Sequence, residues 1–308
     1  MRNVLLIGGT GFVGSHLNAL MSQNCMVTAR GRSLDIRNRP ALEEFLLRER
    51  PNQVIHLAGI TTLRESFEDP RNTFETTFCG TLNLLSALKT AGFSGRMLFV
   101  SSSEVYGLIH EDELPVSETN QTKPQSPYAV AKIAAEALCY QWTKTEAFDI
   151  VVGRPFNHIG PGQSPRFAIS DFGRQIVMIR LGLAPPILHV GDIDTTRDFT
   201  DVRDIVTAYK QLLDRGINGE IYNVCSGIER SIRSLIERMC ELAGIAVELR
   251  TDSSRFRPSE LRRSRGDSRK LSNATGWAPM YSIDQTLRDI LDEWTVRLSG
   301  RLVGNADL

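Results

Sequence analysis

The feature that most constrains the fold is a glycine-rich turn between an apolar run and an amphipathic segment near the N-terminus. Residues 4–7 read VLLI and residues 8–14 read GGTGFVG. Glycines at 8, 11 and 14 allow a tight strand-to-helix turn, and the exposed N–H groups and dipole of the helix that follows attract a phosphate group. Such a triplet alone could be a structural turn without a ligand, but the strand before it and the helix after it predict a dinucleotide-binding unit.

The first half of the chain alternates short apolar runs with longer amphipathic segments. Buried strands are predicted at residues 4–7, 26–29, 54–57, 97–101 and 150–152, and helices at residues 12–21, 39–49, 74–90 and 127–144. Because right-handed crossovers between parallel strands place helices on both faces of a sheet, the pattern predicts an α/β fold, a Rossmann-type doubly wound parallel sheet.

After residue 153 the sequence changes to loops rich in Pro and Gly. Helices are predicted at 167–181, 204–215, 231–243 and 283–298, with one more strand at 221–224. We expect residues 1–153, with a contribution from about 201–226, to form the cofactor-binding domain. Residues 154–308 are expected to form mainly a smaller C-terminal substrate-binding domain.

Charge and cysteine content exclude several classes of partner. The chain has 36 Lys and Arg against 36 Asp and Glu, so its net charge gives no reason to expect binding to nucleic acid or an anionic membrane. The five cysteines lack CxxC spacing, and no histidine has a second ligand at metal-binding spacing, so we expect no metal. With no apolar run of about 18 residues, no membrane span is expected, and the cytoplasm is the expected location.

The end of the second predicted strand carries information about the cofactor. A cofactor without a 2′-phosphate is usually met there by Asp or Glu, but this chain has Arg30 and Arg32. Because a guanidinium binds phosphate in a bidentate manner, NADP(H) is favoured and NAD(H) remains possible. The alternative is that both arginines only face solvent. The candidate cofactor-binding residues are Gly8, Gly11, Phe12, Val13, Gly14, Arg30, Arg32, Asp35, Ile36, Leu57 and Ala58.

Tyr128 and Lys132 form the strongest candidate pair for proton transfer. They stand four residues apart in a predicted helix, so both side chains project from one face. A nearby ammonium group favours the phenolate, which predicts a lowered tyrosine pKa. Upstream, Ser102 and its neighbouring serines follow the strand at 97–101, where ligands of open α/β sheets bind.

Taken together, the motifs resemble those of the extended short-chain dehydrogenases/reductases, the NAD(P)-dependent epimerase/dehydratase group that acts on nucleotide sugars. The motifs are GGTGFVG, HLAG, SSSEVYG, SPYAVAK, RPFNHIGPGQ and RDFTDVRDI, in the family's order over nearly the whole chain. The resemblance implies a nucleotide-sugar substrate and a homodimer formed through the helices at 74–90 and 127–144.

The resemblance also implies roles for individual residues. Ser102 matches the hydroxyl that binds the C4 oxygen of the sugar, Tyr128 the proton donor, and Lys132 the lysine that holds the cofactor ribose. By these roles Tyr128 and Lys132 also count among the cofactor-binding residues. The substrate-binding residues implied by the matching motifs are Ser103, Asn157, Arg197, Arg257 and Glu260.

Within the family, FNHIGPGQ, RDFTDVRDIV, YNVCSG and RPSE are most similar to the branch that reduces GDP-4-keto-6-deoxy-mannose to GDP-rhamnose with NADPH. Two residues bear on the alternatives. Glu104 stands where family dehydratases keep a catalytic glutamate, so a GDP-mannose 4,6-dehydratase or a nucleotide-sugar 4-epimerase stays open. Thr77 stands where many relatives have asparagine. A non-catalytic dinucleotide sensor is the alternative from another class.

Overall fold

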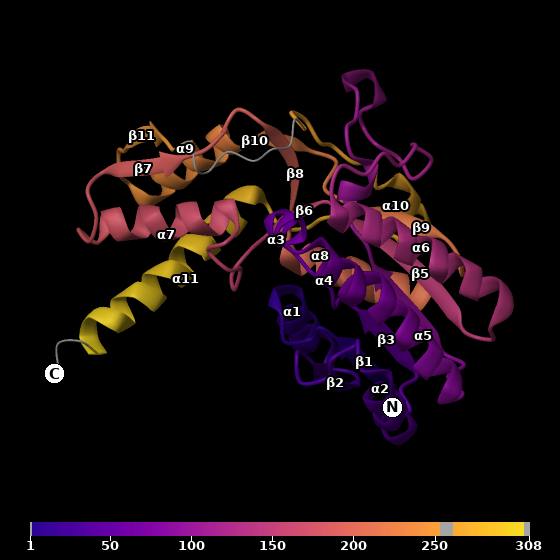
Figure 1. Cartoon of the computed structure of the whole chain (residues 1–308). Helices are drawn as coiled ribbons and strands as arrows, with labels where there is room; N and C mark the ends of the chain where they lie inside the picture. The colour runs from indigo at the N-terminus through magenta and orange to yellow at the C-terminus, as the bar shows by residue number, and fades with distance from the viewer. Residues whose placement is uncertain (1, 253–260, 305–308) are drawn as a thin grey trace.

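A six-stranded parallel sheet forms the larger lobe of the protein, whose computed structural model describes residues 2–252 and 261–304 (Figure 1). The strand order is β2-β1-β3-β4-β5-β9. The strands are β1 (Asn3–Ile7), β2 (Met26–Arg30), β3 (Gln53–His56), β4 (Arg96–Val100), β5 (Asp149–Pro155) and β9 (Ile221–Val224). We call this sheet and its flanking helices the sheet lobe. The predicted α/β parallel sheet is confirmed.

Alternation along the strands explains why helices cover both faces of the sheet. In β1, Val4 and Leu6 pack into one apolar cluster, and Leu5 and Ile7 pack into another on the opposite face. The first cluster includes residues of α1 (Phe12–Met21), α8 (Val202–Arg215) and α10 (Arg269–Thr275). The second includes residues of α2 (Arg39–Glu49), α5 (Gly80–Thr90) and α6 (Pro127–Thr145). The sheet is therefore buried on both sides, as its apolar strands require.

The strand order fixes where a ligand can enter. The chain runs from β1 outward to β2 and then crosses back to β3 on the other side of β1. At such a switch point the two connections diverge and leave a crevice at the carboxyl ends of the strands. The glycine turn after β1 and residues 57–59 after β3 border this crevice.

In the described residues, the second lobe consists of two small sheets and three helices. One sheet has the order β10-β8-β6 and the other pairs β11 with β7. The strands are β6 (Asn157–Ile159), β7 (Ile187–Val190), β8 (Thr196–Asp201), β10 (Glu229–Ser231) and β11 (Glu248–Thr251). With them lie α7 (Ala168–Arg180), α9 (Ile232–Ala243) and α11 (Ile283–Gly304), whose apolar residues share one core.

The boundaries of some elements differ from the sequence-based prediction. The predicted helix at 74–90 is one part of a longer helical stretch made of α4 (Pro70–Phe74), the π-helix η1 (Glu75–Cys79) and α5, preceded by α3 (Leu63–Glu68). Two short 3₁₀ turns, Ser103–Tyr106 and Glu111–Glu113, follow β4. The last helix continues to Gly304, beyond the predicted end at 298. No helix in the described ranges is long and apolar enough to span a bilayer.

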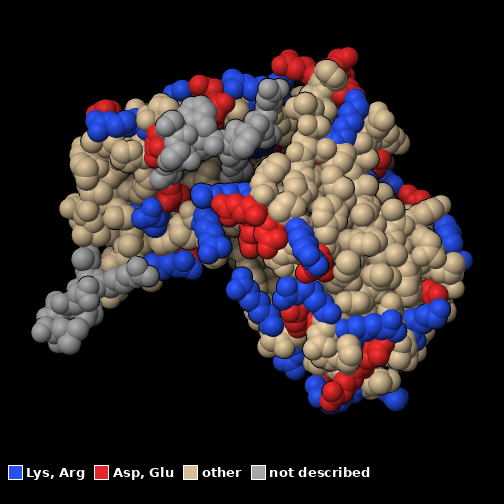
Figure 2. All heavy atoms as spheres, viewed as in Figure 1, with Lys and Arg blue, Asp and Glu red and all other residues tan. Residues whose placement is uncertain are grey.

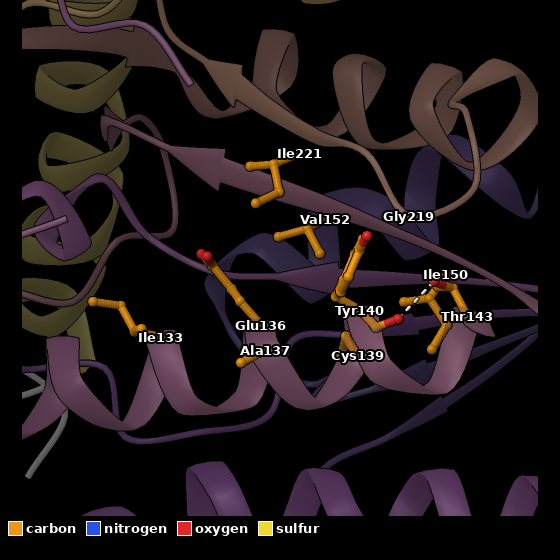
Figure 3. A pocket seen from close by; sticks show the side chains of 10 residues that line it. All are labelled: Ile133, Glu136, Ala137, Cys139, Tyr140, Thr143, Ile150, Val152, Gly219 and Ile221. Carbon is orange, nitrogen blue, oxygen red and sulfur yellow. Dashed lines mark hydrogen bonds between the residues drawn. The ribbon is translucent and has the colours of Figure 1, made fainter. Parts of the chain in front are cut away.

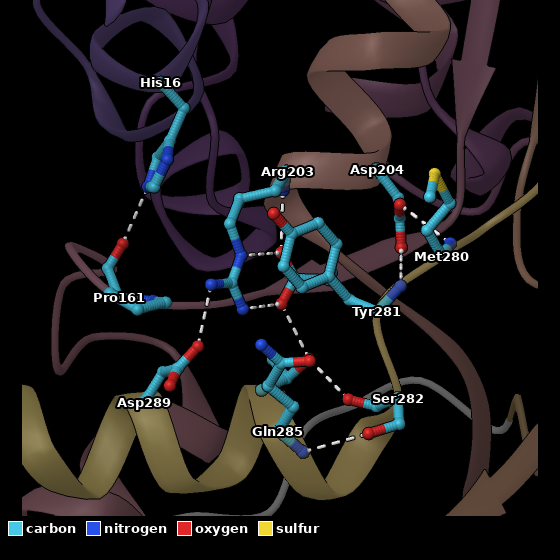
Figure 4. Close-up of polar contacts among 11 residues, drawn as sticks. His16, Pro161, Arg203, Asp204, Met280, Tyr281, Ser282, Gln285 and Asp289 are labelled. Carbon is cyan, nitrogen blue, oxygen red and sulfur yellow. Dashed lines mark hydrogen bonds and ion pairs between the residues drawn. The ribbon is translucent and has the colours of Figure 1, made fainter. Parts of the chain in front are cut away.

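A polar network at the start of α8 joins the two lobes (Figure 4). The Asp201 carboxylate accepts hydrogen bonds from the backbone and guanidinium of Arg203 and from Thr286 Oγ1 of α11. Arg203 also pairs with Asp289 at 2.7 Å, and its guanidinium lies 3.8 Å from the centre of the Tyr281 ring. Helix α11 is therefore bound to the sheet lobe through charged groups and not only through apolar packing.

Replacing Asp201 by alanine is predicted to destabilise the protein. The change removes the N-cap of α8 and leaves Arg203 without its buried partner, so the free energy of unfolding should fall by about 3 kcal/mol. Chemical denaturation followed by circular dichroism measures this. Asp194→Ala, which removes an exposed partner of Arg233, is the control and should change the free energy by less than about 0.5 kcal/mol. Equal losses in the two variants would contradict the role given to Asp201.

Candidate active site

The glycine turn packs so closely against its neighbours that side chains would not fit. Gly8 has a φ of 84°, and a Cβ on it would lie 2.8 Å from the backbone nitrogen of Ala58. A Cβ on Gly14 would lie 2.5 Å from Cα of Gly9. The backbone nitrogens of Gly8 and Gly9 donate hydrogen bonds to the Arg30 carbonyl at 2.7 and 2.8 Å. The turn therefore touches the ends of both β2 and β3, as the switch point requires.

Helix α1 begins directly from this turn without a capping side chain. Its N-cap residue is Gly11, which makes no side-chain hydrogen bond to the first turn. The first turn of α1 contains Phe12, Val13 and Gly14, and no acidic side chain stands there. Backbone N–H groups at a helix start carry partial positive charge, so this turn fits the pyrophosphate of a dinucleotide.

The two arginines at the end of β2 and just beyond it lie beside the glycine turn. The Arg30 guanidinium lies 5.1 Å from the centre of the Phe45 ring, and Arg32 is exposed. Neither forms an ion pair with a carboxylate in the described part of the chain. A Cβ on Gly31, between them, would collide with Thr10 Oγ1 at 1.9 Å, which shows how close this loop lies to the turn.

Asp35 and Ile36 have partners of their own. Arg37 hydrogen-bonds to Asp35, and this bond lowers the pKa of the Asp35 carboxyl group. Ile36 is buried, and a Cβ on Gly80 would lie 2.5 Å from its Cδ1 atom. Leu57 donates its backbone N–H to the Ile7 carbonyl at 2.8 Å, which fixes the chain after β3 beside β1.

Ser102, Glu104 and Tyr128 come together at the end of β4. Ser102 caps the first 3₁₀ turn by accepting a hydrogen bond from the Glu104 backbone nitrogen at 3.2 Å. Tyr128 stands in the first turn of α6, which Ser126 caps. Burial raises the pKa of Tyr128 to about 12, a hydrogen bond with Ser102 opposes this rise, and the negative charge of Glu104 adds to it. The three side chains thus form one electrostatic group.

Lys132 lies one turn further along α6 and is buried. Its Nζ atom donates a hydrogen bond to the Val100 carbonyl at 2.7 Å and lies 5.0 Å from the centre of the Phe99 ring. A Cβ on Gly59 would lie 3.7 Å from this Nζ, so the ammonium group is also close to the end of β3. Burial lowers the pKa of Lys132 to about 8, against the opposing effect of Glu136.

The predicted lowering of the Tyr128 pKa is wrong. The Lys132 Nζ atom points to the Val100 carbonyl and lies 5.9 Å from the centre of the Tyr128 ring. Its charge therefore does not offset the loss of hydration at the phenol, and burial dominates. Sequence spacing shows that two side chains share a helix face, but it does not show which partner each one takes.

A buried ion pair holds α6 against the strands below the site. Both nitrogens Nε and Nη2 of Arg154 donate to the Glu136 carboxylate, at 2.9 and 2.6 Å. Ser101 also donates to Glu136, and the Arg154 guanidinium lies 4.9 Å from the centre of the Tyr106 ring. The Tyr106 hydroxyl donates to Asn223 Oδ1 of β9 at 2.7 Å. The network therefore connects α6 with β4, β5 and β9.

Three of the candidate substrate-binding residues lie on segments that meet where the two lobes join. Ser103 follows β4, Asn157 begins β6, and Arg197 lies in β8. The Arg197 guanidinium donates to the carbonyls of Thr196 and Leu261 at 2.7 and 2.9 Å. Arg257 and Glu260 lie outside the described residues. Figure 2 shows Lys and Arg side chains, with Asp and Glu among them, gathered where the lobes meet.

Residues 27–290 match the family of GDP-mannose 4,6 dehydratase. The chain belongs to this family. It is similar to the GDP-6-deoxy-D-mannose reductase of Pseudomonas aeruginosa, with 45% identity over 302 residues that cover 96% of this chain and 98% of the relative. The GDP-mannose 4,6-dehydratase of Yersinia enterocolitica is 27% identical over 272 residues, 78% of this chain and 72% of the relative.

The fold agrees with a solved structure from the same family. RMD from Pseudomonas aeruginosa complexed with NADPH has a TM-score of 0.92 and 45% identity, and the match covers 96% of this chain and 100% of that chain. The resemblance and the Rossmann-type fold predicted from the sequence are both confirmed.

Sequence reasoning missed the members of the buried network, although a signal for two of them is present. Glu136 follows Tyr128 and Lys132 at the same four-residue interval, within the otherwise apolar stretch IAAEALC. Arg154 is a charge inside the buried run VVGRP. A charged residue in a buried position needs a partner, so these two could have been paired with each other.

Thr77, the departure noted in the sequence, is buried in the π-helix η1. Its Oγ1 atom has no hydrogen-bond partner in the described residues, and a Cβ on Gly59 would lie 3.5 Å from it. The side chain at this position is therefore polar, but it forms no hydrogen bond with a described side chain or backbone group.

An apolar groove elsewhere on α6 contains none of the predicted site residues (Figure 3). It lies between α6 and the strands β5 and β9, and Tyr140 stands over it. Ile133, Val152 and Ile221 are among its lining residues. This groove is separate from the crevice at the carboxyl ends of the strands.

The lowered pKa of Lys132 predicts a pH dependence of stability. An unfolded lysine titrates near 10.5 and the folded Lys132 near 8, so between these values the unfolded chain binds more protons and stability rises with pH. From pH 8 to pH 10, the free energy of unfolding of wild type should therefore rise by about 2 kcal/mol relative to that of Lys132→Met.

Denaturant titrations at several pH values measure this difference. Lys144→Met, at an exposed lysine of the same helix, is the control and should give a difference that does not change over the same range. A wild-type minus Lys132→Met difference that is flat between pH 8 and pH 10 would show that Lys132 is not desolvated as described.

Proposed function

We propose that the protein is an NADPH-dependent 4-ketoreductase that converts GDP-4-keto-6-deoxy-mannose to GDP-rhamnose (GDP-6-deoxy-D-mannose). The observation that carries this proposal is the 45% identity to a GDP-6-deoxy-D-mannose reductase over 96% of the chain. The association of Ser102 with Tyr128, and the placing of Lys132 at the same strand ends, supports a catalytic enzyme and not a dinucleotide sensor.

The proposed mechanism gives each side chain one task. The bound cofactor supplies a hydride to the sugar C4 atom. Tyr128, neutral because its pKa is about 12, donates its phenolic proton to the C4 oxygen as negative charge develops there. Ser102 orients the same oxygen by a hydrogen bond, and both groups are held before substrate binds.

Lys132 has a positioning and electrostatic task in this mechanism. Its Nζ atom has donors left after its hydrogen bond to the Val100 carbonyl, so it can bind the ribose hydroxyls of a dinucleotide in the crevice. Its positive charge also stabilises the tyrosinate that remains after proton transfer. We assign cofactor binding to the glycine turn, residues 57 and 58, and this lysine, and substrate binding to Ser103, Asn157, Arg197, Arg257 and Glu260.

A GDP-mannose 4,6-dehydratase is the second candidate function. Glu104 is the observation that favours it, because its carboxylate is close enough to raise the pKa of Tyr128 by charge repulsion. A carboxylate at this position could remove the C5 proton that dehydration requires. A dehydratase or an epimerase regenerates its cofactor within the cycle, which separates it from a reductase by stoichiometry.

NADP(H) is the proposed cofactor. The Arg30 carbonyl accepts hydrogen bonds from the glycine turn, and Arg32 stands two residues further along the chain. No acidic residue occupies this end of β2. A 2′-phosphate would place its charge on the two arginines, whereas the 2′-hydroxyl of NAD(H) would leave them without a partner. The related structure from Pseudomonas aeruginosa, a complex with NADPH, supports the proposal.

The domain division, oligomeric state and location complete the proposal. We assign cofactor binding to residues 1–153 with 201–226, and substrate binding mainly to residues 154–308.

Exposed apolar side chains on the outer helices, Leu82 of α5 and Val130 and Tyr140 of α6, support a homodimer through these helices. All five cysteines are unpaired, as expected of a protein in the reducing cytoplasm.

Product and cofactor analysis tests the proposed reaction. Incubation of the enzyme with GDP-4-keto-6-deoxy-mannose should consume one equivalent of NADPH for each GDP-rhamnose formed. Tyr128→Phe should lower kcat about 100-fold or more, because it removes the proton donor. Turnover of GDP-mannose without net NADPH consumption would instead establish the dehydratase.

Cofactor preference tests the assignment of the arginines. Arg32→Gln should raise KM for NADPH about tenfold and leave KM for NADH nearly unchanged, because only the 2′-phosphate contact is lost. Steady-state kinetics with both cofactors measure this. Arg64→Gln, at an exposed arginine of α3, is the control and should change neither constant. Parallel increases in both KM values for Arg32→Gln would refute the assignment.

A further inference from the structure

The small sheet β10-β8-β6 places two arginines directly opposite each other. β10 and β8 are antiparallel, with Arg230 facing Arg197 in register. Residues directly opposite in an antiparallel pair have Cβ atoms about 5 Å apart and point to the same face of the sheet. Two guanidinium groups are therefore presented side by side.

The same face of this sheet also carries Asn157. β6 pairs with β8 so that Asn157 faces Phe199, which is two residues beyond Arg197 and hence on the same side of β8. Asn157 is exposed and belongs to the proposed substrate site. One sheet face thus presents an amide and two cations, drawn from three strands, where the lobes meet.

Two acidic residues of this sheet, Asp198 and Glu229, lie on the other face. Asp201, at the end of β8, shares the alternation of Arg197, but its carboxylate is bound by Arg203 and Thr286. Glu229 precedes Arg230 and pairs with Arg263 at 2.8 Å. Asp198 follows Arg197, and its carboxylate accepts hydrogen bonds from the backbone nitrogens of Ser226, Gly227 and Gly266. The alternation along the strands therefore places Arg197 and Arg230 on one face and Asp198 and Glu229 on the other.

Arg230 has little that neutralises it within the described residues. Its one recorded hydrogen bond goes to the Ile228 carbonyl at 3.4 Å, and no described carboxylate forms an ion pair with it. Partial burial lowers the pKa of Arg230, and the charge of Asp198 only partly opposes this effect. Placing like charges directly opposite each other also costs stability.

We propose that Arg230 is a further substrate-binding residue that, together with Arg197, binds the diphosphate of the nucleotide-sugar. This inference rests on the proposed function, in which the substrate is a nucleoside diphosphate sugar. A diphosphate carries two adjacent anionic groups, and each guanidinium can bind one of them with two parallel hydrogen bonds.

The position of the pair also agrees with the path of the substrate. Asp198 holds the loop after β9 and the backbone at Gly266, which puts this sheet beside the carboxyl end of the large sheet. A ligand whose sugar reaches Tyr128 would extend its diphosphate away from β4 and toward the second lobe. Arg230 would act on binding and orientation, not on proton transfer.

Calorimetry with GDP tests the inference. Arg230→Gln should weaken GDP binding about 10- to 100-fold, the loss expected for a charge-assisted hydrogen-bonded contact, and Arg230→Lys should lie between this variant and wild type. Inorganic pyrophosphate should compete with GDP on wild type and much less on Arg230→Gln. NADPH binding should stay within about twofold in all variants, which separates loss of the contact from loss of the fold.

The control is Arg288→Gln, which removes the same charge from an exposed position on α11 and should leave GDP binding unchanged. Equal GDP affinity for wild type and Arg230→Gln would overturn the inference and leave the proposed reductase standing. An equal loss in Arg230→Gln and Arg288→Gln would also overturn it, because net charge would then explain the effect. A wild-type protein that binds neither GDP nor UDP would overturn the proposed function, and the inference with it.

Discussion

The buried ion pair between Glu136 and Arg154 is the interaction on which the arrangement of the site depends. Burying two charges costs several kcal/mol, and this cost is offset only when the geometry is good and the remaining polar atoms are bonded. Here the pair is bidentate and Ser101 adds a third donor to the carboxylate, and of the guanidinium nitrogens Nη1 has no hydrogen-bond partner in the described residues. Because Glu136 belongs to α6 and Arg154 to β5, the pair sets the position of the helix relative to the ends of the strands.

The large sheet and the helices along the whole chain follow from simple sequence signals, but the short strands of the second lobe do not. The strands of the large sheet are continuous apolar runs, buried on both faces, and the glycine turn marks the switch point, so both could be predicted. The strands β6, β8 and β10 are short and contain Asn157, Asp198 and Glu229, whose polarity gives no strand-like alternation. Their order is set by contacts between distant segments, which no local pattern encodes.

The candidate site shows the same division at the level of side chains. The spacing of Tyr128 and Lys132 predicted that they share one face of a helix, and the structure places both at the strand ends. Their electrostatics could not be predicted in the same way, because the Val100 carbonyl that holds Lys132 lies on another element. The placement of Arg197 opposite Arg230 likewise requires the register of two strands that are distant in sequence.

Helix α6 carries Tyr128, Lys132 and Glu136 on successive turns of one rigid element. The proton donor, the cation and the acidic partner of the buried pair therefore keep fixed mutual distances whatever the second lobe does. In the proposed division of the chain, changes in the second lobe would alter which sugar nucleotide binds and leave the chemical step intact. A family with many substrates and one reaction centre is what such a separation allows.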